Sequence, residues 1–231
     1  MEHASTEYNV SQVQILSDLA KRINTINLDH PIRVAIDGID AAGKSTLAGE
    51  LQSAFTVYDR PVIRASIDGF HNPKALRYSQ GRNSPQGYFE DSFNYHALRE
   101  YLLQPLGPEG NRSYCTSCFD YRADRKVVFK PSRASDKSIL LFDGIFLLRP
   151  ELADQWDYSI FVDVSFELSL ARALRRDSGS AESVKSVEQL YRERYFPGQR
   201  LYLDSCHPEL KANVLVRNES IDYPVLEVIR E

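Results

Sequence analysis

The sequence predicts an α/β protein built around a parallel, doubly wound sheet. Five short apolar runs recur along the chain, and segments with helical spacing lie between them. Strands that are covered by helices on both faces read as short, continuous apolar runs. Regular alternation of such strands with helices is typical of a parallel sheet. We therefore interpret residues 1–231 as one α/β domain.

The elements follow one another in a regular order. Apolar side chains between residues 10 and 26 recur at a helical spacing, which predicts an amphipathic helix before the first strand. The first strand spans residues 32–36 and has Pro31 at its start, a position that strands tolerate. The other predicted strands are residues 62–65, 139–142, 159–164 and 213–216, and the other predicted helices are residues 44–55, 95–103, 168–176 and 187–203.

One connection, residues 72–87, differs from the others. It combines Pro73, Gly81, Pro85 and Gly87 with many polar side chains, so we expect a long irregular loop. Long loops inside compact domains are often functional, and this one lies shortly after the second strand.

Composition argues against several classes of protein. The net charge of −4 does not suit a nucleic-acid-binding protein, which usually carries a basic domain. No apolar run approaches the roughly 20 residues that a membrane helix needs, and residues 1–12 lack the pattern of a secretory signal. The three cysteines indicate a reducing compartment, so we expect a cytoplasmic protein. Cys115 and Cys118 form a single C-x-x-C without the further ligands of a zinc site, and whether the pair has a role stays open.

Residues 38–45, G-I-D-A-A-G-K-S, fit the phosphate-binding pattern G-x-x-x-x-G-K-[ST]. The glycines at both ends let the backbone turn so that its N–H groups point at a phosphate chain. Lys44 adds a positive charge for the β- and γ-phosphates, and Ser45 offers a hydroxyl to Mg²⁺. A predicted strand before the motif and a predicted helix after it complete the required context. We therefore expect ATP and Mg²⁺ as cofactors, with the nucleotide held by Gly38, Ile39, Asp40, Ala41, Ala42, Gly43, Lys44, Ser45 and Thr46.

Two carboxylates favour a kinase over other P-loop proteins. Asp143 ends an apolar strand, where an acid holds Mg²⁺, and Gly144 follows it in place of the glutamate that activates water in ATPase motors. The sequence contains no Asn-Lys-x-Asp motif for reading guanine. Asp68 follows the second strand, at the sheet edge where ligands bind, and we expect it to accept the proton of the acceptor hydroxyl. The expected metal ligands are Ser45, Asp68 and Asp143.

Arginines follow the fourth predicted strand on a possible lid. Arg172 and Arg176 are four residues apart and share one face of the helix 168–176. A small, polar stretch at residues 178–183 separates this helix from the next, which suits a lid over about residues 172–203. Together with Lys44, Arg176 is expected to stabilise the charge of the transferring phosphoryl group.

The order of these motifs resembles the uridine kinase and phosphoribulokinase group, which also contains bacterial pantothenate kinases and nicotinamide riboside kinases. The resemblance covers about residues 32–218 and rests on residues 38–45, 68–71, 119–121, 143–145 and 172–177. It implies a P-loop NTPase fold with a five-stranded parallel sheet in the order 2-3-1-4-5, and ATP-dependent phosphorylation of a primary alcohol.

Individual roles follow from the resemblance, position by position. Asp68 matches the base of the family, and Ser45 with Asp143 matches its Mg²⁺ shell, although uridine kinases usually have glutamate at the second position. Arg176 matches the lid arginine that precedes an aspartate, and Arg172 lies one turn before it. The segment that lies against adenine in the family corresponds to Arg217 and Asn218.

The acceptor pocket departs from the uridine kinase pattern. His71 stands where that pattern has tyrosine, and Asp124 stands where it has histidine. The aspartate that holds ribose hydroxyls falls near Tyr88, with Asp91 close by. Acids and histidines offer different donors and acceptors, so these departures put uridine itself in doubt. The expected acceptor residues are His71, Tyr88, Asp91, Phe119 and Asp124.

Three functions remain open at the level of sequence. The leading hypothesis is an ATP-dependent nucleoside kinase of uridine kinase type, whose partner is a small-molecule acceptor rather than a nucleic acid or a membrane. The second is a kinase for pantothenate, nicotinamide riboside or a sugar. The third is a non-enzymatic regulator that binds ATP. The sequence does not identify the acceptor, any feedback regulation or the oligomeric state, and a homo-oligomer is compatible with it.

Overall fold

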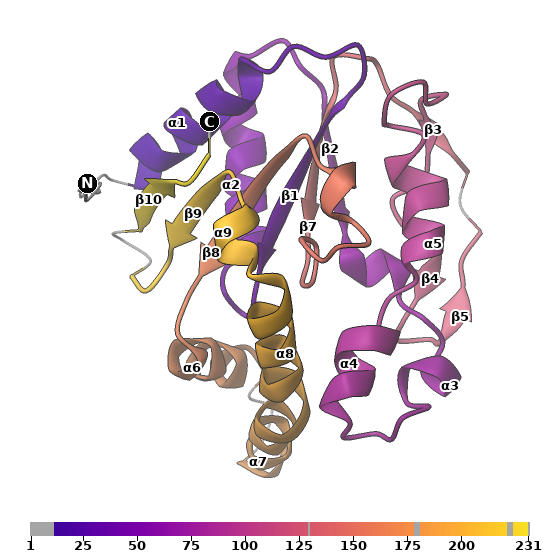
Figure 1. The fold of residues 1–231 in the computed structure, drawn as a ribbon, viewed down its shortest axis with the longest axis vertical. Coiled ribbons are helices and arrows are strands. Elements are labelled where there is room, and N and C mark those ends of the chain that lie inside the picture. Colours follow the sequence, from indigo (N-terminus) through magenta and orange to yellow (C-terminus); the bar gives the residue numbers. More distant parts are fainter. Residues whose placement is uncertain (1–11, 129, 178–180, 221–223, 231) are drawn as a thin grey trace.

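The central feature of the fold is one mixed sheet (Figure 1). A computed structural model describes residues 12–128, 130–177, 181–220 and 224–230 of the chain. The strands of the sheet are β1 (Ile32–Gly38), β2 (Val62–Ser66), β7 (Ile139–Asp143), β8 (Tyr158–Asp163), β9 (Val214–Arg217) and β10 (Val225–Val228). Within the described residues they lie in the order β10-β9-β8-β1-β7-β2.

Five of these strands run parallel to their neighbours. Counted along the chain among themselves, they follow the order 2-3-1-4-5, which confirms the predicted sheet. The sixth strand, β10, pairs antiparallel with β9, with Val225 opposite Arg217 and Val228 opposite Val214. The strand β10 was not predicted because none of its side chains is fully buried at the edge of the sheet, so they do not form the apolar run of a central strand.

Helices pack on both faces of this sheet. Figure 1 shows α1 and α2 on one side and α4 and α5 on the other, which agrees with two separate hydrophobic cores. The α-helices are α1 (Gln12–Asn24), α2 (Lys44–Ala54), α3 (Lys74–Arg77), α4 (Pro85–Asp91), α5 (Tyr95–Leu98), α6 (Phe166–Asp177), α7 (Ala181–Leu190), α8 (Phe196–Cys206) and α9 (Pro208–Lys211).

Side chains of the central strands alternate between the two cores. Val34 and Ile36 of β1 pack in the core that includes Leu19 of α1, whereas Ala35 lies in the opposite core with Phe142 of β7. Successive side chains of a strand point to opposite faces, so a strand that is covered on both sides is mostly apolar, and its buried charged residues need partners. Full burial of a leucine such as Leu19 is worth roughly 1.5–3 kcal/mol, which fixes α1 against the sheet.

The connection 72–87 is more regular than expected. It contains α3 and the start of α4, so the prediction of an irregular loop is wrong for these parts. The start of α4 carries ordinary helix signals, because the Ser84 hydroxyl accepts a 3.0 Å hydrogen bond from the Gly87 N–H and Pro85 occupies the first turn. Two of the predicted helices are also interrupted by π-helical turns, at Arg99–Leu103 after α5 and at Tyr191–Tyr195 between α7 and α8.

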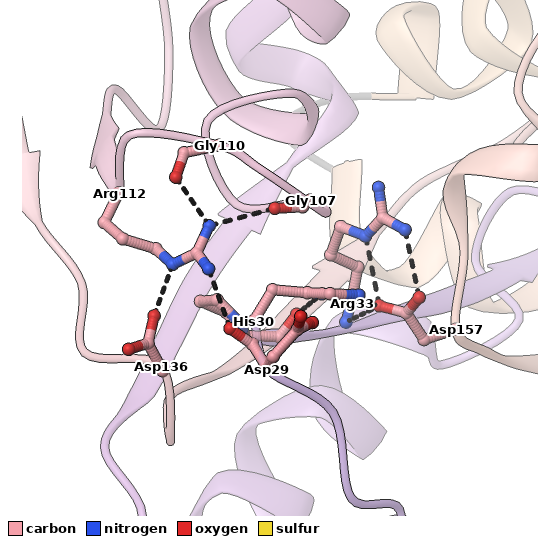
Figure 2. Close-up of polar contacts among 9 residues, drawn as sticks. Asp29, His30, Arg33, Gly107, Gly110, Arg112, Asp136 and Asp157 are labelled. Atoms are coloured by element: carbon pink, nitrogen blue, oxygen red, sulfur yellow. Dashed lines mark hydrogen bonds and ion pairs between the residues drawn. The ribbon is translucent and has the colours of Figure 1, made fainter.

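Two arginines secure the end of the sheet that lies away from the carboxyl ends of the strands (Figure 2). Arg33, at the start of β1, donates two side-chain hydrogen bonds of 3.0 and 2.9 Å to the carboxylate of Asp157. Arg112 forms a 2.6 Å bond with Asp136 and donates to the backbone carbonyls of Asp29, Gly107 and Gly110. These bonds connect the loops at this end of the sheet, so we interpret the role of the two arginines as structural.

Small β-ladders lie in the connection between α5 and β7. They are β3 (Ser113–Tyr114) paired with β6 (Ser132–Arg133), and β4 (Phe119–Asp120) paired with β5 (Arg125–Lys126). Among the described residues, no helix combines the length and the apolar character that crossing a bilayer requires.

Candidate active site

A cleft of about 690 Å³ opens at the carboxyl ends of the parallel strands. This is the edge at which open α/β sheets bind their ligands. Residues from the loop after β1, the turn after β2, the end of β7 and the helices α4 and α6 all line it. Of the residues predicted for the site, those that line the cleft are Asp40, Ala41, Gly43, Lys44, Ser45, Thr46, Asp68, His71, Tyr88, Asp143, Arg172, Arg176 and Asn218.

The phosphate-binding loop connects β1 to α2, as predicted, and its two glycines are needed for different reasons. Gly38 has φ of 148°, and a Cβ there would lie 2.3 Å from the carbonyl oxygen of Val162. Gly43 has φ of 100°, and a Cβ there would lie 2.6 Å from the side-chain nitrogen of Asn218. Any side chain would therefore force the loop away from its neighbours, in addition to the strain of these backbone angles.

A buried carboxyl group supports this loop from below. Asp37 accepts a 2.8 Å hydrogen bond from the Gly38 N–H, a 3.2 Å bond from the Leu148 N–H and a further bond from the Tyr202 hydroxyl of α8. Burial raises the pKa of Asp37 to about 6, against the opposing effect of the Tyr202 and Gly38 hydrogen bonds. The loop is thereby pinned to the strand and to α8 at its first residue.

Lys44 lies at the start of α2 and points back along the loop. Its ammonium group donates a 2.7 Å hydrogen bond to the carbonyl oxygen of Ile39. Burial lowers the pKa of Lys44, while the carboxylates around it, Asp40 first among them, act in the opposite direction. The N-terminus of α2 adds partial positive charge at the same place, so this part of the cleft favours an anion such as a phosphate chain.

The groups proposed to bind Mg²⁺ lie next to Lys44, around the hydroxyl of Ser45. The Ser45 hydroxyl donates a 2.6 Å hydrogen bond to Oδ2 of Asp143, and Arg64 lies 3.3 Å from Oδ1 of the same carboxylate. Asp68 lines the same cleft. No group of three or more His, Cys, Asp or Glu side chains in the described chain forms a metal cage. A hydroxyl with nearby carboxylates fits Mg²⁺, which takes oxygen ligands and usually keeps several waters and substrate phosphates.

Asp68 lies in a single turn after β2. Its backbone N–H donates a 3.4 Å hydrogen bond to the hydroxyl of Ser66, which fixes the turn, and its side chain is exposed to the cleft. Partial removal from water raises the pKa of Asp68; His71 lowers it, and the nearby carboxylates of Asp40 and Asp143 raise it further. An accessible carboxylate with a raised pKa is a suitable proton acceptor.

Aromatic rings form the wall next to Asp68. The ring of His71 stacks on Tyr121 at 4.8 Å between centroids and 28° between planes, and it lies 4.6 Å from Phe93. Burial lowers the pKa of His71, which favours the neutral imidazole. Tyr88 and Tyr195 continue the wall, with their centroids 4.8 Å apart. Sequence reasoning missed Tyr121 and Tyr195, although Tyr121 belongs to the 119–121 run that indicated the family.

Asp40 connects the phosphate-binding loop to the lid region, a contact that the sequence did not indicate. Its Oδ2 accepts hydrogen bonds from the Tyr88 hydroxyl at 3.0 Å and from the Gln199 amide of α8 at 2.7 Å. Its carbonyl oxygen accepts a 2.6 Å bond from the Ser169 hydroxyl of α6. Three elements therefore hold one residue of the loop, and Asp40 adds a carboxylate to the cleft.

Besides Gly38, Ile39 and Ala42 of the phosphate-binding loop, four of the predicted site residues do not line the cleft. Phe119 is buried in the core, and Asp91 accepts side-chain hydrogen bonds from its neighbours Ser79 and Gln80. Asp124 has φ of 50° in a turn and accepts a 2.8 Å bond from the Lys74 N–H, with Arg77 at 3.3 Å.

Arg217, the fourth of these residues, pairs with Asp163 and Glu227 across the β9 edge. Its partners come from the neighbouring strand β8 and from the unpredicted strand β10. The sequence analysis did not include that strand, so these ion pairs were not foreseeable from the motif alone.

The arginines of α6 lie beside the phosphate-binding loop. Arg172 donates a 2.8 Å hydrogen bond to the carbonyl oxygen of Asn218 and approaches that of Ala42 at 3.5 Å. Arg176 lines the cleft one turn further on. Residues 178–180 of the predicted lid lie outside the described residues. Asn218 in turn donates a 2.7 Å bond to the carbonyl oxygen of Ala42, so the segment after β9 also contacts the loop.

A parallel sheet in the order 2-3-1-4-5, with a phosphate-binding loop after its central strand and acids at the ends of β7 and β2, the next two strands on one side, defines a P-loop kinase. Within this class, the sequence profile of the phosphoribulokinase/uridine kinase family matches residues 33–214. The chain belongs to this family.

Relatives with established names are distant. Uridine-cytidine kinase B of Dictyostelium discoideum is 26% identical over 166 residues, which cover 71% of this chain and 65% of that protein, less than two thirds of its length. Uridine kinase of Proteus mirabilis is 26% identical over 172 residues, which cover 71% of this chain and 77% of that protein. The structure of a possible uridine kinase from Bacillus stearothermophilus is similar with a TM-score of 0.69, covering 88% of this chain and 98% of that chain at 21% identity, a likeness that shows the fold.

Proposed function

We propose that the protein transfers the γ-phosphate of ATP to a hydroxyl group of a small molecule, and that the acceptor is a nucleoside. One observation carries this proposal above the others. The accessible carboxylate of Asp68 shares a single cleft with Lys44 and with the aromatic wall around His71. A protein that only binds ATP as a signal needs no proton acceptor beside the γ-phosphate, so this arrangement favours an enzyme over a regulator.

Each group has a task in the proposed transfer. The loop N–H groups and Lys44 hold the phosphates, and Ser45 with Asp143 would hold Mg²⁺, which neutralises charge on the β- and γ-phosphates when bound. Asp68 accepts the proton of the acceptor hydroxyl as the oxygen attacks the γ-phosphorus. Arg172 and Arg176 stabilise negative charge on the transferring group. The remaining wall of the cleft orients the acceptor.

The chemistry of the acceptor end supports a nucleoside. The rings of His71 and Tyr121 offer flat faces on which a planar base can stack, and offset or tilted aromatic contacts of this kind are favourable. Asp40 and Asp68 offer acceptors for ribose hydroxyls and repel an acceptor that carries its own carboxylate, such as pantothenate. The named relatives that phosphorylate uridine or cytidine agree with this choice.

The free state of all three cysteines supports the proposal that the protein works in a reducing compartment such as the cytoplasm.

A panel of acceptors tests the proposal. Uridine, cytidine, nicotinamide riboside, pantothenate and simple sugars are assayed by ADP release at fixed ATP and Mg²⁺. We expect the highest kcat/KM on a nucleoside. A panel in which pantothenate or a sugar exceeds every nucleoside ten-fold removes the nucleoside and leaves a kinase for another small alcohol. ATP binding without acceptor-dependent ADP release on any member favours the regulator instead.

A further inference from the structure

The cleft has a second flank that the proposed phosphoryl transfer does not use. Gln12, Ile15 and Leu16 of α1 line it, together with Glu50 of α2 and Asn218 after β9. The family profile matches residues 33–214, so α1 and Asn218 lie outside the matched segment. The resemblance to the family therefore gives α1 no role, and its part in the cleft comes from the structure of this chain.

Sheet order separates this flank from the acceptor end. The phosphate-binding loop follows β1, Asp68 follows β2 on one side of β1, and Asn218 follows β9 on the other side. Figure 1 shows α1 beside β10 and β9, on that second side, and Ile15 of α1 shares a core with Val216 of β9. Glu50 lies six residues after Lys44 on α2, about 9 Å along the helix axis from the phosphate-binding end. The flank therefore lies in the same cleft as the phosphate-binding loop, on the side of β1 away from Asp68.

The Gln12–Glu50 pair of the flank presents hydrogen-bond acceptors. The side-chain nitrogen of Gln12 donates 2.8 Å hydrogen bonds to both carboxylate oxygens of Glu50. A carboxylate can only accept, so the amide of Gln12 must turn its NH₂ group toward Glu50 and leave its own Oε1 outward. Within the described chain, no hydrogen bond to that oxygen is formed. The edge of the flank therefore carries amide and carboxylate oxygens, and Leu16 beside it is apolar.

We propose that α1 forms a wall that recognises the base of the phosphate donor, in which the Gln12–Glu50 pair accepts a hydrogen bond from an exocyclic amine. The 6-amino group of adenine has this chemistry, whereas a purine without the amine leaves the acceptor oxygens unpaired. The partly buried, apolar side chain of Leu16 contacts the flat face of the base. This inference rests on the proposed use of ATP and assigns donor selectivity to an element outside the family segment.

A binding experiment without any acceptor tests the wall. The dissociation constants of ATP and of purine riboside triphosphate, which lacks only the 6-amino group, are measured by calorimetry with Mg²⁺ on the full chain. Gln12→Ala and Glu50→Ala remove the pair. Gln14→Ala is the matched control. Gln14 lies on the same helix, is exposed and does not line the cleft, and its side chain donates a 2.9 Å hydrogen bond to Asp18.

We expect the unmodified protein and Gln14→Ala to prefer ATP about ten-fold, which corresponds to ~1.4 kcal/mol, within the range for one hydrogen bond. In Gln12→Ala and Glu50→Ala the preference should fall to about two-fold, while binding of the analogue changes little. Equal binding of both nucleotides by the unmodified protein overturns the inference. The inference is also overturned if the variants lose affinity for ATP and for the analogue to the same extent, because the Gln12–Glu50 pair then only stabilises packing. If neither nucleotide binds, the proposed function fails together with the wall; if ATP binds and is used without preference, only the wall fails.

Discussion

Replacing Asp37 by asparagine gives a quantitative test of how the phosphate-binding loop is supported. The side chain is fully buried, and its pKa rises from an ordinary 3.8 to about 6 in the folded protein. Well below pH 3.8, the carboxyl group is protonated in both states and imposes no penalty. As the pH rises toward 6, the unfolded chain releases its proton first, so the folded state loses stability relative to the unfolded one.

The size of this effect follows from the difference between the two pKa values. At ~1.4 kcal/mol for each pH unit, a rise from 3.8 to about 6 corresponds to about 3 kcal/mol of lost stability above pH 6. Asp37→Asn removes the titration and keeps the shape of the side chain. The variant should therefore gain about 3 kcal/mol relative to the unmodified protein between pH 4 and pH 7. Its altered hydrogen bonds with Gly38, Leu148 and Tyr202 change the free energy of unfolding by the same amount at pH 4 and at pH 7, so they do not affect the difference.

Urea unfolding at a series of pH values measures the difference. Trp156, the single tryptophan, reports unfolding because its indole N–H donates a 2.9 Å hydrogen bond to the Leu147 carbonyl oxygen in the folded state. Asp59→Asn, at an exposed position, controls for removing one carboxylate from the chain. A stability difference between Asp37→Asn and the unmodified protein that is the same at pH 4 and pH 7 refutes the reasoning.

Three further substitutions test the site. Asp68→Asn should reduce turnover by ~10²–10⁴-fold and leave ATP·Mg²⁺ binding in place, as measured by kinetics and calorimetry; near-normal turnover would assign Asp68 to structure. In the unmodified protein, kcat should fall on acidification at a pH above the ordinary range of an aspartate, because the pKa of Asp68 is raised and the protonated form cannot accept a proton. Lys44→Ala should reduce phosphoryl transfer by orders of magnitude and weaken ATP binding, and calorimetry with unchanged affinity and turnover would contradict the phosphate site. Asp124→Ala should lower the free energy of unfolding by about 1–2 kcal/mol with the KM for ATP unchanged, because Lys74 and Arg77 lose their acceptor; an acceptor-selective loss of activity at normal stability would return Asp124 to the pocket.

Sequence periodicity was sufficient for the parallel part of the fold. In β7 every side chain is buried, and all but its last residue, Asp143, are apolar, which leaves a clear signal in one sequence. The edge strand β10 has no fully buried side chain and gives no such signal. The helices within residues 74–91 were hidden for a different reason: Gly and Pro suggested a loop, whereas Pro85 occupies a helix start.

The nucleotide half of the site was more predictable than the acceptor half. The phosphate-binding loop is one continuous segment whose geometry requires specific residues, so Lys44 and Ser45 could be placed from the motif. The acceptor wall is assembled from separate segments, and its members are defined by tertiary contacts such as that between His71 and Tyr121. Asp124 shows the limit: its position in the motif order suggested the pocket, but its carboxylate is used to hold Lys74.

The role of Asp40 also lay beyond the sequence. Its position in the loop predicted contact with phosphate, yet its side chain accepts from Tyr88 and Gln199, which are 48 and 159 residues away in the chain. No local pattern relates such residues. Contacts of this kind require the folded chain, and they are where the loop, the acceptor wall and the lid region meet.

The destination of the γ-phosphate tests the central claim most directly. The protein is incubated with Mg²⁺, uridine or cytidine, and ATP labelled at the γ-phosphate, and the products are separated and identified by mass spectrometry. The account predicts label in the nucleoside monophosphate, with one ADP formed for each product molecule and none formed by Lys44→Ala. Label that remains in ATP, or that appears only as inorganic phosphate while ATP is bound, would contradict transfer to a nucleoside.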